Sequence, residues 1–156
     1  MPIVKFYRND PTAPKRTQRT HLGANAINVY DDKILLEKRR DSNTWGLVGG
    51  GVKNHETALQ AIVREVKEEL GLRIPPEKFE KLRVYGEPGR IAAYCDGSVW
   101  QMVIVVFKLE LDCVPSIILS DESLGMQFFT RDELKNIEIV VTHEDIVEDC
   151  FVNTLF

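Results

Sequence analysis

Three glutamates in the segment REVKEE, residues 64–69, are spaced so that a helix would bring them together. Glu65, Glu68 and Glu69 are related by i, i+3 and i+4, and residues at these separations are neighbours on a helix surface. Like charges placed in this way repel one another by roughly 0.2–0.5 kcal/mol per pair. The pattern therefore predicts a positive group between them, and Mg²⁺ is a cation that takes carboxylate oxygens together with water and substrate phosphates.

A glycine-rich segment, WGLVGGG at residues 45–51, precedes the glutamates. Because glycine has no side chain, the backbone carbonyls of this bend can approach the same ion. Arg64 has another role available, since a guanidinium can pair with a neighbouring carboxylate and hold it in one orientation. The alternative is an exposed helix in which Arg64 and Lys67 neutralise the glutamates. The glycines and Glu56 favour the metal site over this alternative.

The helix that positions the glutamates is expected at residues 56–70. Glu65 and Glu69 lie about 100° from its apolar stripe, so they should border a cleft beside the sheet. Gly71 stands where a left-handed residue commonly ends a helix. The apolar residues at helical spacing are Leu59, Ile62, Val66 and Leu70.

The rest of the chain shows mainly strand and turn signals. A short strand and an irregular arm are expected in residues 1–20, and a helix with Thr142 as its cap at 142–156. Because strands outnumber helices and interleave with them irregularly, we predict an α+β fold with a mixed sheet. Further strands are expected at residues 21–30, 33–39, 45–51, 98–111 and 126–130, a helical turn in RIPPEKF, and the start of a short helix at 131–134.

The composition limits the classes of protein. A chain of 156 residues with 44% apolar residues suits one domain, 1–156. No apolar run approaches a membrane span and residues 1–10 lack an extended apolar region, so we expect a cytoplasmic protein without a membrane segment or secretory signal. The net charge of −4 argues against binding a nucleic acid polymer. Residues 1–40 nevertheless carry nine Lys or Arg against four Asp or Glu, which suits a small phosphorylated ligand.

The cysteines and histidines show no ligand pattern. Three widely spaced cysteines fit neither a disulfide framework nor a zinc site, and we interpret them as buried reduced thiols. The histidines are expected at surface or cap positions. These residues are Cys95, Cys113 and Cys150, and His21, His55 and His143.

The spacing around the glutamates resembles the Nudix box at every fixed position. Gly50 is followed after five residues by Glu56, and after seven more by REVKEELGL at residues 64–72. This is similar to the family pattern G-x5-E-x7-R-E-U-x-E-E-x-G-U, in which U is aliphatic. Val48 departs from the lead-in of many members, which have proline there, and should alter the rigidity of the bend rather than the chemistry. The flanking strand order also resembles a Nudix domain.

The resemblance implies a hydrolase that depends on Mg²⁺ or Mn²⁺ and cleaves a nucleoside diphosphate linked to another moiety. It implies a Nudix-type α/β/α sandwich in which residues 50–72 form a loop–helix–loop. On this basis Glu65 and Glu69 look like the principal metal ligands. Glu68 looks like a further ligand or a holder of metal-bound water, and Gly49 like a ligand through its carbonyl.

Supporting roles follow from the same resemblance. Glu56 and Arg64 are expected to orient the helix and its carboxylates. The general base stays open between a box glutamate and a later acid, for which Glu122 is the best candidate; its alternative is a solvated loop acid. Arg39 is similar in position to a phosphate-contacting arginine of the family, and an ordinary charge at a strand end is the alternative.

The substrate is less constrained than the reaction. Pro88 resembles a proline of the ADP-ribose pyrophosphatase subgroup, while a nucleoside triphosphate pyrophosphohydrolase, including one for oxidised nucleotides, is the second candidate. A non-catalytic nucleotide-sensing module is an alternative of another class, disfavoured because all the box glutamates are kept.

Two further segments each have two possible roles. Tyr94 and Trp100 either pack in the core or stack on a base, and residues 15–19 are either a solvated arm or one that reaches a phosphate, including across a homodimer.

Overall fold

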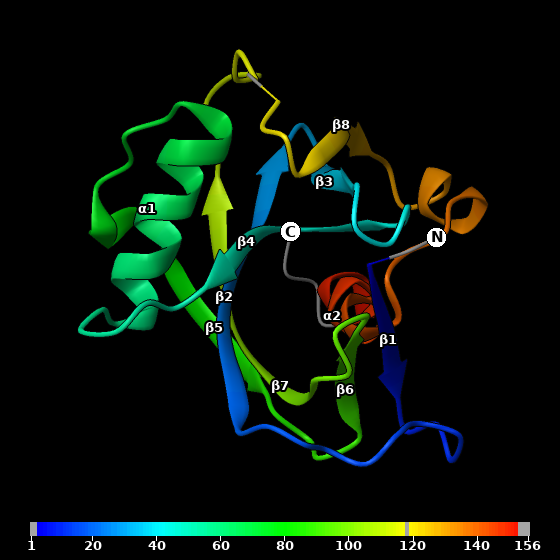
Figure 1. The fold of residues 1–156 in the computed structure, drawn as a ribbon. Coiled ribbons are helices and arrows are strands. Elements are labelled where there is room, and N and C mark those ends of the chain that lie inside the picture. Colours follow the sequence, from blue (N-terminus) through cyan, green and yellow to red (C-terminus); the bar gives the residue numbers. More distant parts are fainter. Residues whose placement is uncertain (1–2, 118, 153–156) are drawn as a thin grey trace.

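The eight strands in the described part of the chain belong to one mixed sheet, which is curled in the computed structural model (Figure 1). The structure describes residues 3–117 and 119–152. The strand order is β1-β6-β7-β2-β4-β3-β8, and β5 also pairs with β7. The strands are β1 (Val4–Arg8), β2 (Thr20–Tyr30), β3 (Lys33–Arg39), β4 (Trp45–Gly51), β5 (Glu80–Tyr85), β6 (Arg90–Tyr94), β7 (Val99–Glu110) and β8 (Ser123–Phe129). The helices are α1 (Ala58–Leu70) and α2 (Val141–Val152), with 3-10 turns at Pro76–Lys78 and Glu133–Asn136.

The long strand β2 organises the middle of the sheet. It runs parallel to β7 over its length, whereas the other strand pairs are antiparallel. On its other side β2 pairs first with the glycine end of β4 and then, through Val29 and Tyr30, with β3. The backbone of Gly49–Gly51 is therefore hydrogen-bonded into the centre of the sheet.

The two helices lie on opposite sides of this sheet (Figure 1). Alternate residues of the strands face α1, where Ile62 and Val66 are fully buried against Phe107. The other residues face α2, where Ile146 packs with Ile104. This arrangement confirms the predicted α+β fold and its α/β/α layers.

Local signals at its two ends fix α1. Thr57 forms a capping box with Gln60, in which each side chain accepts a hydrogen bond from the other residue's backbone N–H. Gly71 ends the helix in the left-handed conformation, with φ of 69°. The helix therefore starts two residues later than position 56 and ends where predicted. Its buried stripe is the expected one, except that Leu59 is only half-buried.

Several predictions for the second half of the chain were wrong. Thr142 is buried inside α2, which begins at Val141, so it is no cap; residues 153–156 of the expected helix lie outside the described residues. Strands β5 and β6 were not predicted. Cys95 and Cys113 are exposed, although all three cysteines are free, as expected. No helix in the described ranges is long and apolar enough to cross a membrane.

His143 was also predicted wrongly, because it is buried in α2 rather than exposed or at a cap. Its Nδ1 accepts a hydrogen bond of 3.0 Å from the backbone N–H of Leu47 on β4. Burial lowers the pKa of His143 to about 3, so the ring is neutral near pH 7 and can accept this bond. The imidazole thus connects α2 to the strand that carries the glycines.

Candidate active site

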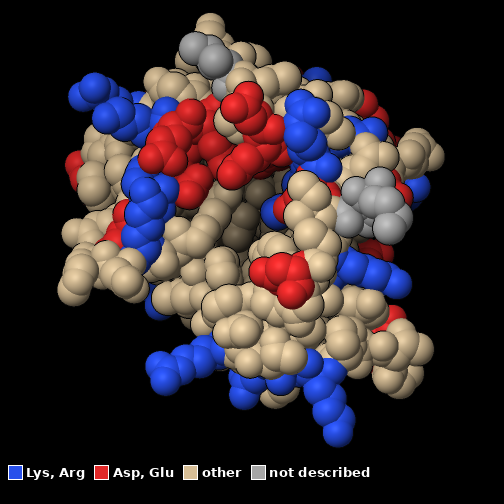
Figure 2. All heavy atoms as spheres, viewed as in Figure 1, with Lys and Arg blue, Asp and Glu red and all other residues tan. Residues whose placement is uncertain are grey.

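A cavity of about 440 Å³ brings together residues from the two ends of the Nudix-like segment and from β3. Its wall on the side of α1 includes Gly49, Gly50, Gly51 and Glu69, and its other walls come from β1, β2, β3, β6, β7 and α2. Figure 2 shows acidic side chains gathered along the rim of a hollow on this face of the molecule. The cavity therefore has a strongly acidic side that includes the end of α1.

Two glycines of β4 allow close approach on this side. Gly49 has φ of 149°, and a Cβ there would lie 2.2 Å from the carbonyl oxygen of Ala24. A Cβ at Gly50 would lie 2.5 Å from Oε1 of Glu65. The lack of side chains is therefore what lets the Glu65 carboxylate rest against the backbone of β4.

Arg64 binds three of the carboxylates around it. Its Nε and Nη2 donate to the two oxygens of Glu56 at 2.8 and 2.9 Å, and its Nη1 donates to Glu65 at 2.9 Å. Glu68, whose side chain is 54% exposed, is 3.3 Å from the same nitrogen. The hydrogen bonds from Arg64 lower the pKa of Glu56 to about 2. The structure thus contains the orienting pairs that were predicted for Arg64.

Glu69 has a very different environment. Its Oε2 is buried and has no hydrogen-bond partner among the described residues. Burial, and next the charge of Glu37, raise the pKa of Glu69 well above its usual range. Glu37 comes from β3, is 7% exposed, and accepts a short hydrogen bond from Oγ of Ser123. Sequence reasoning missed Glu37, although a lone acid in the apolar strand KILLEKR was an available signal.

The donors on this side fit a hard divalent cation. Glu69 offers a buried carboxylate oxygen that no group in residues 3–117 and 119–152 hydrogen-bonds, and glycines of β4 line the same cavity. As the described side chains are placed, no three His, Cys, Asp or Glu residues gather around one point, and Arg64 engages both Glu65 and Glu68. Glu68 also does not line the cavity. Glu69 is therefore the best placed of the three predicted side-chain ligands.

The opposite side of the cavity carries a paired arginine. Arg39 donates from Nε and Nη2 to the two oxygens of Asp41 at 3.0 and 2.7 Å, and its guanidinium lies 5.2 Å from the ring centre of Phe6. Burial is the largest single influence on the pKa of Asp41 and raises it, but the hydrogen bonds and charge of Arg39, together with hydrogen bonds from Ser42, outweigh burial and lower this pKa. Arg39 thus lines the cavity, as a phosphate contact requires, with its charge largely balanced.

The remaining predicted residues lie in three places. Glu122 lines the cavity, and its carbonyl accepts a hydrogen bond of 3.0 Å from the Arg40 N–H. Tyr94 also lines it, whereas Trp100 packs edge-on against His21 at 6.1 Å. Pro88 lies elsewhere, in a hollow formed with the N-terminal arm at residues 9–16.

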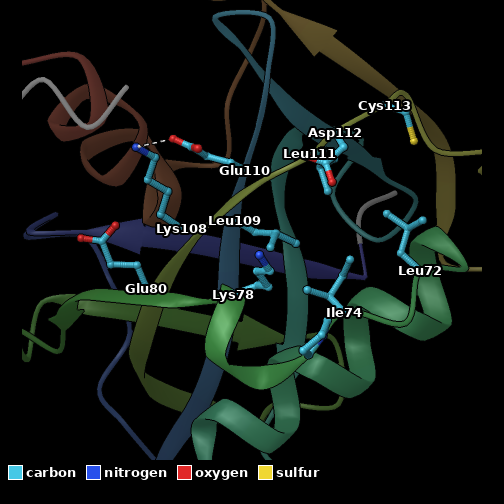
Figure 3. Close-up of a pocket in the computed structure, with 11 residues that line it drawn as sticks. Leu72, Ile74, Lys78, Glu80, Lys108, Leu109, Glu110, Leu111, Asp112 and Cys113 are labelled. Atoms are coloured by element: carbon cyan, nitrogen blue, oxygen red, sulfur yellow. Dashed lines mark ion pairs between the residues drawn. The ribbon is translucent and has the colours of Figure 1, made fainter.

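A second hollow of about 480 Å³, shown in Figure 3, lies near Leu72, beyond the end of α1. Its apolar side chains include Ile74 and Leu109, and its charged residues are spread around the edge. Lys108 there pairs with Glu110 at 3.4 Å. Because this hollow contains neither the box carboxylates nor the glycine bend, it is the weaker candidate for catalysis.

Comparison with known proteins agrees with this geometry. A family model described as the NUDIX domain matches residues 19–150. The chain belongs to the Nudix family. This Nudix chain is 35% identical over 122 residues to an ADP-ribose pyrophosphatase of Methanocaldococcus jannaschii, covering 76% of this chain and 66% of the relative. It is 29% identical over 98 residues to the nucleoside triphosphatase NudI of Enterobacter sp., covering 61% and 67%.

Solved structures share the Nudix fold. The NUDIX domain of Shewanella oneidensis NrtR, complexed with ADP ribose, aligns with a TM-score of 0.67 at 19% identity over 93% of both chains. A bifunctional NMN adenylyltransferase/ADP ribose pyrophosphatase from Francisella tularensis, complexed with AMP and a Mn ion, aligns with a TM-score of 0.66 at 22% identity. That match covers 90% of this chain and 43% of the other. The chain spans about two thirds of the length of the two curated relatives.

Proposed function

We propose that this Nudix protein hydrolyses the pyrophosphate bond of a nucleoside diphosphate linked to another moiety, with ADP-ribose as the first candidate. The observation that carries the proposal is the unpartnered Glu69 oxygen beside Gly49 and Gly50, at the end of a complete Nudix box. The relative from Methanocaldococcus jannaschii, named an ADP-ribose pyrophosphatase, supports the choice of substrate.

The proposed reaction depends on Mg²⁺ or Mn²⁺. Glu65, Glu69 and the carbonyl of Gly49 would hold the cation, and Glu68 would reach it by leaving Arg64. When bound, such a cation neutralises diphosphate charge and lowers the pKa of its water. The Mn ion in the Francisella tularensis structure is consistent with this dependence.

In the proposed reaction, side chains of the protein position the metal ligands, the water and the phosphate. Arg64 holds Glu65 and Glu56 in fixed orientations, so the acidic side of the cavity is ordered before substrate arrives. Glu122 is the proposed base from outside the box, because it lines the cavity on the loop before β8. Arg39 is the proposed phosphate contact through Nη1, which Asp41 does not use.

A second candidate is a nucleoside triphosphate pyrophosphohydrolase, favoured by the similarity to NudI. A nucleotide-sensing module is the alternative of another class. The three readings differ in what they release: a nucleoside monophosphate and a sugar phosphate, a nucleoside monophosphate and pyrophosphate, or nothing.

A substrate panel tests the proposal directly. The protein is incubated with Mg²⁺ or Mn²⁺ and, separately, ADP-ribose, other nucleotide sugars, dinucleoside polyphosphates and nucleoside triphosphates, including oxidised ones. Products are separated by ion-exchange chromatography. We expect AMP and ribose 5-phosphate from ADP-ribose at the highest kcat/KM. Binding of nucleotides without any product would favour the sensor and contradict the proposal.

A further inference from the structure

Glu37 is an acid outside the Nudix box that faces the box across the cavity. It lies on β3, whereas Glu69 lies near the end of α1, and both line the same cavity. Glu37 is 7% exposed, and Oε2 of Glu69 is buried without a hydrogen-bond partner among the described residues. Two acids from separate walls of the same cavity are therefore largely withdrawn from solvent.

No basic side chain separates these two acids in the contacts of the described residues. Arg64 donates to Glu56, Glu65 and Glu68, and neither Glu37 nor Glu69 is among its partners in the described residues. Arg39, the nearest arginine along β3, donates two hydrogen bonds to Asp41, so its charge is shared between Asp41 and Glu37. Burying two further carboxylates beside one shared arginine is costly, and a divalent ion from outside the chain would lower this cost.

Glu37 is held in place for such a role. β3 and β8 pair in antiparallel register, with a shift between Lys38 and Arg39 that sets Arg39 opposite Ser123. The hydroxyl of Ser123 then reaches diagonally to Oε1 of Glu37 and donates to it. At 7% exposure the carboxylate has little freedom to turn into solvent. Its orientation is therefore fixed by a partner that lies 86 residues along the chain.

We propose that Glu37 is a further metal-binding carboxylate, contributed by β3, which binds the same divalent cation as Glu69 from the opposite wall. This inference rests on the metal dependence in the proposed function and adds a residue to it. The unpartnered Oε2 of Glu69 and the Ser123-fixed Glu37 are independent observations that point to one occupant. Ser123 is a positioning residue in this scheme.

Binding of Mn²⁺ to the protein without substrate tests the proposal. Free Mn²⁺ is measured by EPR in titrations of the wild type, Glu37→Gln, Glu69→Gln and Ser123→Ala, at one pH. Glu37→Gln keeps the shape and can still accept from Ser123, so the fold should persist, as circular dichroism will check. We expect Glu37→Gln to raise the Kd for Mn²⁺ by about 10–100-fold and Ser123→Ala by less.

The control is Glu80→Gln, which removes an exposed glutamate at the second hollow and should leave the Kd unchanged. If Glu69→Gln weakens binding and Glu37→Gln does not, the role of Glu37 is refuted while the proposed function stands. If neither weakens binding, the metal dependence fails and this inference with it. If Glu37→Gln does not fold, Glu37→Asp replaces it in the test. Aspartate is one methylene shorter, so its carboxylate lies further from the cation, and the proposal requires that this variant also raises the Kd for Mn²⁺.

Discussion

The two flanks of α1 carry the same residue type in opposite electrostatic conditions. On the outer flank, Glu56 and Glu68 pair with the guanidinium of Arg64, which also holds Glu65. On the inner flank, Glu69 lies beside Glu65 and lines the same cavity as Glu37, and Oε2 of Glu69 has no partner among the described residues. The protein satisfies the first set with its own guanidinium, and the proposed divalent cation would satisfy the second set. On this proposal, one row of glutamates in a sequence combines a structural clamp with a metal site.

The largest effect should come from removing the inner charge. Glu69→Gln keeps the size of the side chain and removes a proposed ligand, so we expect turnover to fall by about 100-fold or more, with an unchanged circular dichroism spectrum. Glu68→Gln is the matched change on the outer flank and should cost about tenfold at most. Steady-state kinetics with the best substrate of the panel measures both. Equal losses would contradict the difference between the flanks.

The two flanks should also respond to pH with opposite signs when metal is chelated. Arg64 lowers the pKa of Glu56 from 4.5 to about 2, so the ionised form of Glu56 stabilises the fold above pH 4.5 and this stabilisation is lost towards pH 2. The pKa of Glu69 is raised, chiefly by burial, so its stabilisation is present below pH 4.5 and is lost as pH rises.

The Tm in EDTA, measured by circular dichroism from pH 3 to pH 8, checks these signs. At pH 7 we expect the Tm of Glu56→Gln to be lower than that of the wild type, and this difference should shrink as the pH falls towards 3. The Tm of Glu69→Gln should rise relative to that of the wild type as the pH increases. A shift of both variants in the same direction would show that the flanks do not differ in this way.

The smallest effect is expected far from both flanks. Pro88 lies in a hollow with the N-terminal arm, so Pro88→Ala should change the kcat/KM of each substrate within about twofold, as for surface substitutions worth about 0.5 kcal/mol. The substrate panel, repeated on this variant, provides the measurement. A changed order of substrates would instead support the substrate role that the sequence predicts for Pro88.

The parts of the molecule that sequence predicts well are those with local causes. The helix of the box follows from its apolar stripe, from Gly71 and from a capping box between neighbouring residues. β3 and β4 match the expected ranges 33–39 and 45–51, because apolar or glycine-rich runs between turn residues define both. The pairing of Arg64 with nearby acids is equally local.

The parts that sequence misses depend on distant partners. β5 is exposed at most of its positions and charged, so it lacks the alternation of a half-buried strand. β6 begins with Arg90, which is fully buried because it pairs with Asp145, 55 residues away. Glu37 and His143 look like surface residues until Ser123 and Leu47 are placed beside them. No local pattern contains that information.

The hydrogen bond between His143 and Leu47 couples the position of α2 to that of β4. Leu47 is two residues before Gly49, so an imidazole on α2 helps to position the glycine bend of β4. A tag, truncation or bound partner that tilts α2 would therefore shift β4 through this hydrogen bond. Such a change near the carboxyl end could lower turnover without altering any residue that lines the cavity.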